Sequence, residues 1–344
     1  MSRTRLELTR PQILAFRRRT GALDARLPPG PASLRRAAWA GLQDSMPRAA
    51  LLSIHARVAG AGPATWEDPS LLQLWGPRFS VFVVAAHDLA LFSLGRLPDD
   101  ERGRRRAEDL ATRLATVLGG RRMTYEQAGR ELGVHPNSLR YAAATGTVVL
   151  RWEGARQSTV WTVPRPAMAP GDARRELARR YLHIYGPATA GAFAQWAGIS
   201  ARAGAAAIDA LADGLAPVRT PVGEGWILAS DEAAFRADPG PAAPARLLPS
   251  GDAYFLLQGA DRDLLVPEEN RRRELWTPRV WPGALLVGGE IAGTWRRADA
   301  TLTVRAWRRL SPGELDAVEE EARSLPLPRT GAGTGRTVML RWEG

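Results

Sequence analysis

The chain has 344 residues, 45% of them hydrophobic, and is too long for a single core, so several domains are expected. Its 47 basic and 36 acidic residues give a net charge of +11, and every basic residue is an arginine, the side chain best suited to contact phosphates. The sequence contains no cysteine, which excludes disulfides, thiolate metal sites and a cysteine nucleophile. The charge makes an anionic polymer the first partner to consider, although uniform use of arginine also fits a coding bias.

The four histidines are scattered without a pair at metal-ligand spacing, so neither a metal nor another cofactor is expected. The first residues lack the apolar core of a signal peptide, and no apolar run reaches membrane-spanning length. We therefore expect a cytoplasmic, nucleoid-associated protein with duplex DNA as its partner and no membrane contact.

The N-terminal part of the chain predicts helices around a polar elbow. The helices are expected over residues 9–26, 34–42 and 49–58. Residues 41–47 between the last two are polar, and Pro47 disfavours a continuous helix there. Residues 78–84 are rich in β-branched and aromatic side chains, which is typical of a strand. We expect residues 1–105 to form a first winged-helix unit.

Residues 121–163 have the pattern of a complete DNA-binding module. Thr124 followed by Gln127 has the spacing of a capping box and starts a helix that ends at Gly133. Pro136 then starts a second helix, which ends at residues 145–146. This second helix is expected to enter a major groove with two exposed side chains, Asn137 and Arg140.

A hairpin follows these two helices. Hydrophobic residues alternate from 148 to 152, a turn follows at 153–154, and residues 158–163 return as the partner strand. Helix, turn, helix and hairpin predict a winged helix-turn-helix over residues 106–168, whose hairpin places Arg151 and Arg156 near phosphates. The same pattern also fits a structural or protein-binding module that never touches DNA.

The module is followed by a repeat of its landmarks. Four positions recur 65 residues later in the chain. They are Thr124, Gly133, Val134 and Trp161, which recur as Thr189, Gly198, Ile199 and Trp226. Residues 169–236 are therefore expected to form a third winged helix.

The C-terminal part predicts a linker, strands and a tail. Residues 239–249 are rich in Ala and Pro, as in a linker. Short strands are expected over residues 253–257, 284–287, 291–295 and 302–307. They predict a small β-barrel over residues 237–328, followed by a flexible tail over 329–344. The last eight residues match residues 147–154 at all but one position, and no physical reason for the copy is evident.

The order of these features resembles the winged-helix DNA-binding proteins that include the bacterial AlkZ and YcaQ DNA glycosylases. The matching residues are Gly41-Leu42-Gln43, Leu248-Pro249 with Asp252 and Tyr254, Asp261-Arg262, and residues 288–297. The resemblance implies an α+β fold of three tandem winged helices around a basic channel, with a C-terminal β-barrel. It also implies excision of alkylated or crosslinked bases from DNA.

The catalytic signature of that family is a glutamine, an apolar residue, and a glutamine or aspartate, which hold water against the anomeric carbon. This sequence keeps Gln43 and has Asp44 and Ser45 at the next two positions, so these three residues are the catalytic candidates. Asp44 is an available carboxylate, although its neighbouring position is expected to point it elsewhere. Serine has a shorter reach and cannot act as a base at neutral pH, so the water clamp is incomplete. The family's Arg-x-Thr-x-His pattern is reduced here to Arg78 and Ser80, which are expected to contact DNA.

Each of these readings has an alternative. Residues 43–45 also fit a polar elbow in which Asp44 and Ser45 bond to the local backbone. Arg296 and Arg297 are expected to contact DNA from a hairpin, or to protect an edge strand by charge. The sequence therefore predicts a DNA glycosylase relative acting on modified bases, with a non-enzymatic DNA-binding or regulatory protein as the alternative and an interaction scaffold as the third.

Overall fold

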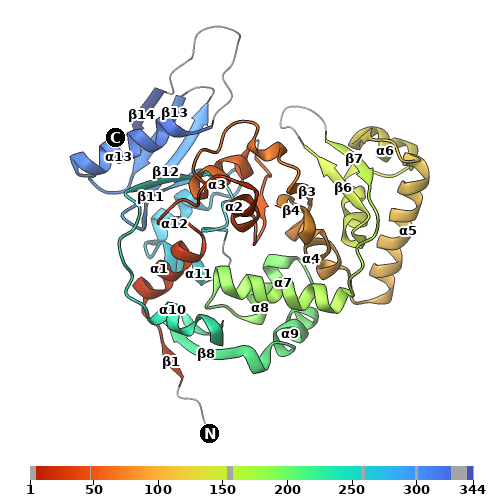
Figure 1. Cartoon of the computed structure of the whole chain (residues 1–344), viewed down its shortest axis with the longest axis horizontal. Coiled ribbons are helices and arrows are strands. Elements are labelled where there is room, and N and C mark those ends of the chain that lie inside the picture. Colours follow the sequence, from red (N-terminus) through yellow and green to blue (C-terminus); the bar gives the residue numbers. More distant parts are fainter. Residues whose placement is uncertain are drawn as a thin grey trace.

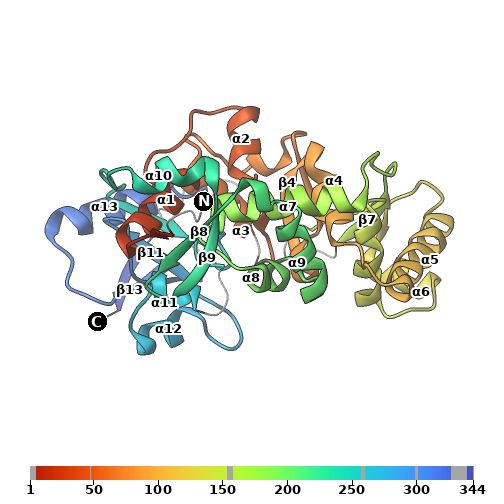
Figure 2. The ribbon, with the colours of Figure 1, turned by 90° about the horizontal axis from the view of Figure 1, so that it is seen from below.

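The computed structural model describes residues 5–46, 48–152, 158–256, 260–298, 301–326 and 339–343. The fold is mixed α+β, with three sheets of three strands and one of five strands. The five-stranded sheet lies at one end of the molecule and residues 101–162 lie at the other (Figures 1 and 2). No helix of these described ranges is both long and apolar enough to cross a membrane.

The first sheet has the strand order β2-β4-β3. Its strands are β2 (Leu42–Gln43), β3 (Leu71–Trp75) and β4 (Val81–Ala85). The helices of this region are α1 (Arg10–Thr20), α2 (Pro31–Ala37), α3 (Ala49–Arg57) and α4 (Leu89–Ser93), with 3₁₀ turns η1 (Thr65–Glu67), η2 (Pro77–Phe79), η3 (Ala86–Asp88) and η4 (Leu94–Arg96). α2 and α3 pack against the strands, and apolar side chains from both helices and from the sheet form one core.

Three local expectations are corrected in this region. The first helix ends at Thr20, because Gly21 caps it and Ala22 has a positive φ of 52°. The second begins at Pro31 rather than at residue 34. Residues 78–80 are not in a strand, since they form the tight turn that joins β3 to β4.

The second sheet has the order β5-β7-β6 and belongs to the module expected from the sequence. Its elements are α5 (Glu101–Leu118), β5 (Met123–Thr124), α6 (Tyr125–Glu131), η5 (Pro136–Thr145), β6 (Val148–Arg151) and β7 (Thr159–Thr162). The Thr124 hydroxyl accepts a hydrogen bond from the backbone N–H of Gln127, so the expected N-cap is confirmed. The side chain of Gln127 contacts Glu131 instead of completing a capping box.

The expected second helix of this module is a 3₁₀ helix, η5, rather than an α-helix. Three of its five buried residues, Leu139, Ala142 and Thr145, are spaced three apart, and the other two are Ala143 and Ala144. In a 3₁₀ helix side chains three apart lie directly above one another, so this spacing places all three on one buried face.

The third sheet has the order β1-β8-β9, and its first strand comes from the N-terminus. Its elements are β1 (Leu6–Glu7), α7 (Pro170–Tyr185), α8 (Ala190–Ala197), α9 (Ala201–Asp209), η6 (Ala212–Gly214), β8 (Leu215–Thr220), β9 (Gly223–Leu228), η7 (Ala229–Asp231) and α10 (Glu232–Arg236). Thr189 caps α8 as Thr124 caps α6, and Gly198 has the same left-handed backbone as Gly133. The positions that repeat in the sequence therefore occupy equivalent places in the structure.

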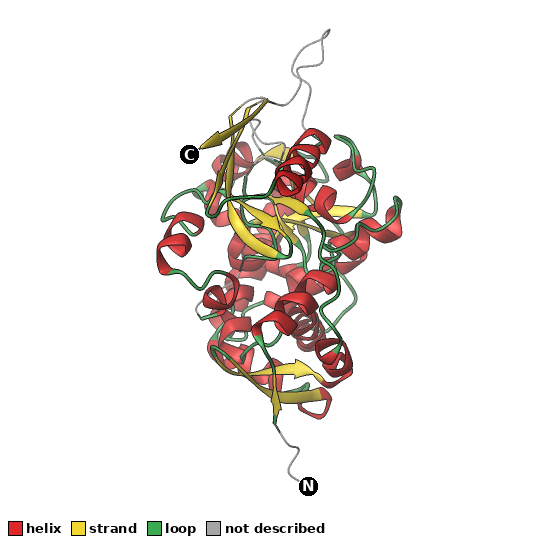
Figure 3. Ribbon diagram, turned by 90° about the vertical axis from the view of Figure 1, so that its left-hand side faces the viewer, coloured by secondary structure: helices red, strands yellow, loops and turns green. Residues whose placement is uncertain are grey.

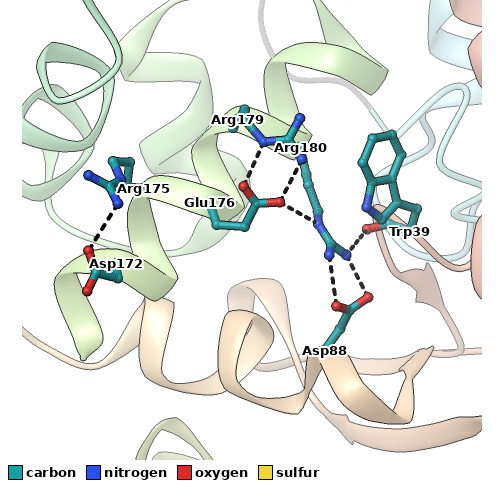
Figure 4. A network of polar contacts seen from close by, with 7 residues as sticks. All are labelled: Trp39, Asp88, Asp172, Arg175, Glu176, Arg179 and Arg180. Carbon is teal, nitrogen blue, oxygen red and sulfur yellow. Dashed lines mark hydrogen bonds and ion pairs between the residues drawn. The ribbon is translucent and has the colours of Figure 1, made fainter. Parts of the chain in front are cut away.

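An ion-pair network joins the third region to the first (Figure 4). Arg180 of α7 donates two hydrogen bonds to the Asp88 carboxylate, at 2.6 and 2.8 Å, and a third to the backbone oxygen of Trp39. Glu176, one turn earlier, accepts from both Arg179 and Arg180. Because Arg180 and Asp88 are both buried, this bidentate pair fixes α7 against the first sheet's helices.

The C-terminal sheet is open, with the linear order β10-β11-β12-β13-β14, so the expected closed β-barrel is not formed by the described strands (Figure 3). The elements are β10 (Ala245–Leu248), α11 (Asp261–Leu265), α12 (Glu269–Leu275), β11 (Gly283–Val287), β12 (Glu290–Ala298), β13 (Thr301–Ala306), α13 (Pro312–Ser324) and β14 (Met339–Glu343). One core contains apolar residues of this sheet and of α13, so a helix, not further strands, covers that side of the sheet.

Three further expectations are corrected in this region. Residues 245–248 of the expected linker are the buried strand β10. Residues 253–256 form a buried turn rather than a strand. Residues 339–343 of the expected flexible tail are β14, which pairs in parallel with β13 and places Leu340 and Trp342 against the sheet's core.

Candidate active site

Gln43 lies at the end of β2, beside the turn that joins β3 to β4. It is partly buried and pairs with Phe82 of β4. Arg78 of the turn donates a hydrogen bond to Oε1 of Gln43, at 3.2 Å, and Nε2 of Gln43 donates to Oγ of Ser45, at 3.1 Å. Both ends of the amide are therefore held, and one lone pair and one N–H remain for a ligand.

The turn that carries Arg78 has an unusual backbone. Arg78 and Phe79 have φ angles of +54° and +58°, in the left-handed region that side chains other than glycine rarely adopt. Gly198, at the end of α8, packs against this turn, and a Cβ on it would lie 3.0 Å from the backbone nitrogen of Arg78. Strained backbone of this kind is concentrated at functional sites, where the surrounding structure enforces it.

A loop of the C-terminal region closes another side of Gln43. A Cβ on Gly251 would lie 3.2 Å from Nε2 of Gln43, so a glycine allows this close approach. The next residue, Asp252, accepts two hydrogen bonds from Arg57 and one from Ser53 of α3, at 2.6 to 2.8 Å. This buried ion pair fixes the loop relative to Gln43.

Asp44 points away from Gln43 into the protein. Its Oδ1 accepts from the backbone N–H of Ala50 in the first turn of α3, and its Oδ2 accepts from Nε2 of Gln73. Burial raises the pKa of Asp44 from 3.8 to about 6, against the opposing effect of these hydrogen bonds. Asp44 therefore bonds to nearby backbone, as the alternative for the elbow expected, whereas Ser45 is bonded to Gln43 rather than to the backbone.

Asp44→Asn is expected to remove a pH dependence of folding stability. Because the folded-state pKa lies above the ordinary value, Asp44 contributes stability that is fully present below about pH 4 and is lost as the pH rises through about 6. A shift of about two pH units corresponds to about 3 kcal/mol. In urea unfolding, the difference in the free energy of unfolding between the variant and the unsubstituted protein should shift in favour of the variant by about this amount from about pH 4 to pH 7. A difference independent of pH would contradict the assignment.

Positive charge is concentrated around Gln43. Arg96 is fully buried and donates to the backbone oxygens of Ala197 and Trp75. Burial, together with the charge of Arg78, lowers the pKa of Arg96 to about 9, so it stays charged at neutral pH. Burial also lowers the pKa of Arg262, again with a contribution from Arg78. Arg78 and Arg96 donate to an amide oxygen and to backbone oxygens rather than to a carboxylate, so these contacts do not neutralise their charges.

A family model described as "DNA glycosylase AlkZ-like" matches residues 36–326, a span that contains all of these site residues. The chain belongs to the AlkZ-like DNA glycosylase family. A comparison with curated proteins gives no match. Among solved structures, the fold is similar to that of the Streptomyces sahachiroi DNA glycosylase AlkZ, with a TM-score of 0.76 and 18% sequence identity over 98% of this chain and 100% of that chain.

In this AlkZ-like protein, the three residues of the family signature alternate in direction. Gln43 and Ser45 are hydrogen-bonded to each other on the side of Arg78, whereas Asp44 is buried on the other side. The structure therefore brings the first and third signature positions together and places the middle one outside the site. No group of three or more His, Asp or Glu in the described part of the chain could hold a metal ion.

The side chains expected to contact DNA are spread over the molecule. Arg140 is half-buried, and its guanidinium lies 5.8 Å from the ring centre of Phe79, so it is not the exposed group that a groove-reading helix would present. Asn137 is exposed and accepts a hydrogen bond from Tyr125. Ser80 closes the Arg78 turn through its backbone oxygen, which accepts from Gly76.

The remaining expected contacts lie in two hairpins. Arg151 stacks on Trp66, at 3.4 Å from the ring centre, and lies 3.5 Å from the Glu67 carboxylate. Arg156 lies outside the described residues. Arg296 and Arg297 are exposed on β12, where they pair with β13 but lie beyond Trp295, the last residue of β12 that pairs with β11, so both alternatives for them stay predictions.

Gly198, Gly251 and Arg96 were not predicted as site residues from the sequence. Gly198 and Gly251 approach the site through the backbone, and the guanidinium of Arg96 lies 5.1 Å from the ring centre of Phe79 in the Arg78 turn. The repeat that contains Gly198 and the matching Asp252 beside Gly251 were the available signals, but neither indicates which surface the residue contacts.

Proposed function

We propose that this AlkZ-like protein hydrolyses the N-glycosidic bond of modified bases in duplex DNA, with Gln43 positioning the water. The observation that carries the proposal is the Gln43 amide, held by Arg78 at its oxygen and by Ser45 at its nitrogen. With its amide fixed, the free lone pair of Oε1 accepts a hydrogen bond from the water, and Ser45 offers a second polar contact. Positioning of this kind requires no reorganisation during the reaction.

The chemistry follows from the charge of the leaving base. Water attacks the anomeric carbon, the bond to the base nitrogen breaks, and its electron pair leaves with the base. A base alkylated on a ring nitrogen is already cationic and departs neutral, so the water proton passes to solvent and no strong base is needed. Neither Ser45 nor the buried Asp44 is required to remove a proton, which fits their positions.

The scaffold is proposed to be three winged helices, over residues 1–105, 106–168 and 169–236, followed by the C-terminal sheet region. Each region has at least one helix, then a short segment that pairs with a hairpin. That segment is β2 in the first region, β5 in the second, and the single bridge residue Ala188, which lies 65 residues after Met123, in the third. On this proposal Gln43 lies in the short strand of the first winged helix, between α2 and α3. Arg78, Asn137, Arg296 and Arg297 remain proposed DNA contacts.

The direct test is incubation of the protein with duplex DNA carrying alkylated purines, followed by alkaline cleavage at abasic sites. Strand breaks that depend on both the protein and the lesion are expected. Intact alkylated and crosslinked DNA would instead favour a second candidate, a non-enzymatic DNA-binding protein. That candidate is supported by Ser45, which stands where the family has a longer polar side chain.

Binding to duplex DNA is expected to be tolerant of sequence and strongly dependent on salt. With a net charge of +11, phosphate contacts should dominate. If six or more phosphates are neutralised, the affinity should fall on the order of a thousandfold between about 50 and 200 mM salt. Fluorescence anisotropy with labelled duplexes of two unrelated sequences measures this. Absent or salt-independent binding would contradict the DNA-binding functions and favour a scaffold.

A further inference from the structure

A cleft lies between the first sheet and the β6–β7 hairpin, away from the Gln43 site. Its volume is about 420 Å³, in the range of a small-molecule site. It is lined by residues of η1, β3, β4, β6 and β7, together with Arg122. The residues that carry its chemistry are Trp66, Glu67, Arg122, Arg151 and Trp161.

Most of the first-sheet residues that line the cleft lie on the face opposite Gln43. Val83, which lines the cleft, pairs with Leu42 and Gln73, whereas Gln43 pairs with Phe82. Paired residues of an antiparallel sheet share a face and successive residues alternate, so Gln73 and Val83 lie opposite Gln43, while Leu72 reaches the cleft from the other face of the edge strand β3. None of the side chains that hold Gln43 lines the cleft, so the cleft is distinct from the site already described.

One wall of the cleft is fixed by hydrogen bonds that reach across the two regions. The amide of Gln73 accepts from the backbone N–H of Trp152, at 2.7 Å, and donates to Asp44. Trp66 is held between two guanidinium groups, those of Arg48 at 3.6 Å and Arg151 at 3.4 Å from its ring centre. Both cannot occupy one face of the ring at these distances, so they lie on opposite faces. The cleft is thus preformed.

The chemistry of the lining combines flat surfaces with positive charge. Arg122 stacks 4.2 Å above the ring centre of Trp161, which is half-exposed. The lining contains two guanidinium groups, those of Arg122 and Arg151, against the single carboxylate of Glu67. Guanidinium planes and indole rings are the surfaces on which nucleobases stack, and guanidinium groups bind phosphate.

We propose that this cleft binds one nucleotide, with its base stacked on the Trp161 and Arg122 side and its phosphate held by guanidinium groups. The nucleotide is either free or an unpaired residue of a DNA strand, since both present the same base and phosphate. Glu67 disfavours a ligand of purely anionic character, so both the base and the phosphate contribute to recognition.

The test uses the full chain and two probes: deoxyadenosine 5′-monophosphate, followed by calorimetry, and a duplex with a single unpaired adenosine compared with its fully paired counterpart. Arg122→Ala should weaken binding of a probe at least about tenfold, because a charge-assisted contact is lost. Arg121→Ala is the matched control, since Arg121 is the exposed neighbour of the same charge and bonds only to the backbone of residues 117 and 118. Trp161→Phe keeps a ring and should weaken binding less than Trp161→Ala.

The two probes distinguish a free nucleotide from an unpaired nucleotide of a DNA strand. If the mononucleotide binds the unsubstituted protein and Arg122→Ala abolishes this binding, the ligand is a free nucleotide. If instead the protein prefers the duplex with the unpaired adenosine and only Arg122→Ala abolishes this preference, the ligand is part of a DNA strand. Deoxyadenosine and inorganic phosphate should each bind more weakly than the mononucleotide. Equal effects of Arg121→Ala and Arg122→Ala, or no binding of either probe to the folded protein, would overturn the proposal. Neither result depends on base excision, so failure of the glycosylase proposal is distinguishable.

Discussion

Replacing Gln43 with Ala is expected to lower the rate of alkylpurine excision by about 100- to 1,000-fold, the loss seen when one preorganised polar contact is removed from a transition state. The affinity for duplex DNA should stay nearly unchanged, because the lost contact is made to the reacting water and not to the DNA backbone. Single-turnover excision and anisotropy titrations of the same preparations measure the two quantities.

The matched control is Gln127→Ala, which removes an exposed glutamine from α6 and should leave excision intact. Ser45→Gln tests the same site in the opposite direction, since it restores a second amide beside Gln43 and should raise the rate. An inactive unsubstituted protein together with an inactive Ser45→Gln variant would refute the glycosylase proposal. Normal excision by the Gln43→Ala variant would show that the active site lies elsewhere in the protein.

Arg57→Ala is expected to lower the free energy of unfolding by about 3–5 kcal/mol, because it leaves the Asp252 carboxylate buried without its cation. Asp252 is 1% exposed and accepts both hydrogen bonds of the Arg57 fork. The loop that carries Gly251 against Gln43 is held by this pair, so excision should also fall at temperatures where the variant remains folded. Urea unfolding at neutral pH measures the first effect.

Arg105→Ala provides the surface control, since the Arg105–Glu101 pair is exposed and should contribute less than about 1 kcal/mol. The double variant Arg57→Ala, Asp252→Ala removes both charges and should be more stable than Arg57→Ala alone. Equal losses for Arg57→Ala and Arg105→Ala would show that the buried pair does not carry the stability assigned to it.

The parts of the fold that the sequence determined are those set by neighbouring residues. The caps at Thr124 and Thr189 act within three residues, and Gly288 with Gly289 forms a hairpin turn through positive φ angles. The repeat at an offset of 65 residues correctly placed the helix starts and glycine turns of two regions. The strands over 284–287, 291–295 and 302–307 were also found, because each is a short run of residues typical of strands.

The parts that only the tertiary structure decided depend on residues distant in sequence. Residues 136–145 were expected to be a helix of the ordinary kind, but packing on α5 and the first sheet accompanies a three-residue period. The short C-terminal strands were expected to close into a barrel, yet α13 covers one side of their sheet, which stays open. The last strand, β14, lies in the near-copy of residues 147–154 but pairs in parallel with β13, whereas β6 pairs with β7, and local pattern does not specify the partner.

The candidate site shows the same division. The sequence identified Gln43 and Ser45 through a family signature and suggested that Asp44 pointed elsewhere, which follows from the alternation of a strand. It did not identify Gly251 or Gly198, because a glycine that permits close approach is recognisable only when the opposing surface is known. The charge of the chain was evident from composition, but burial of Arg96 and the strained turn at Arg78 place that charge beside Gln43, and both arise from packing between regions far apart in the sequence.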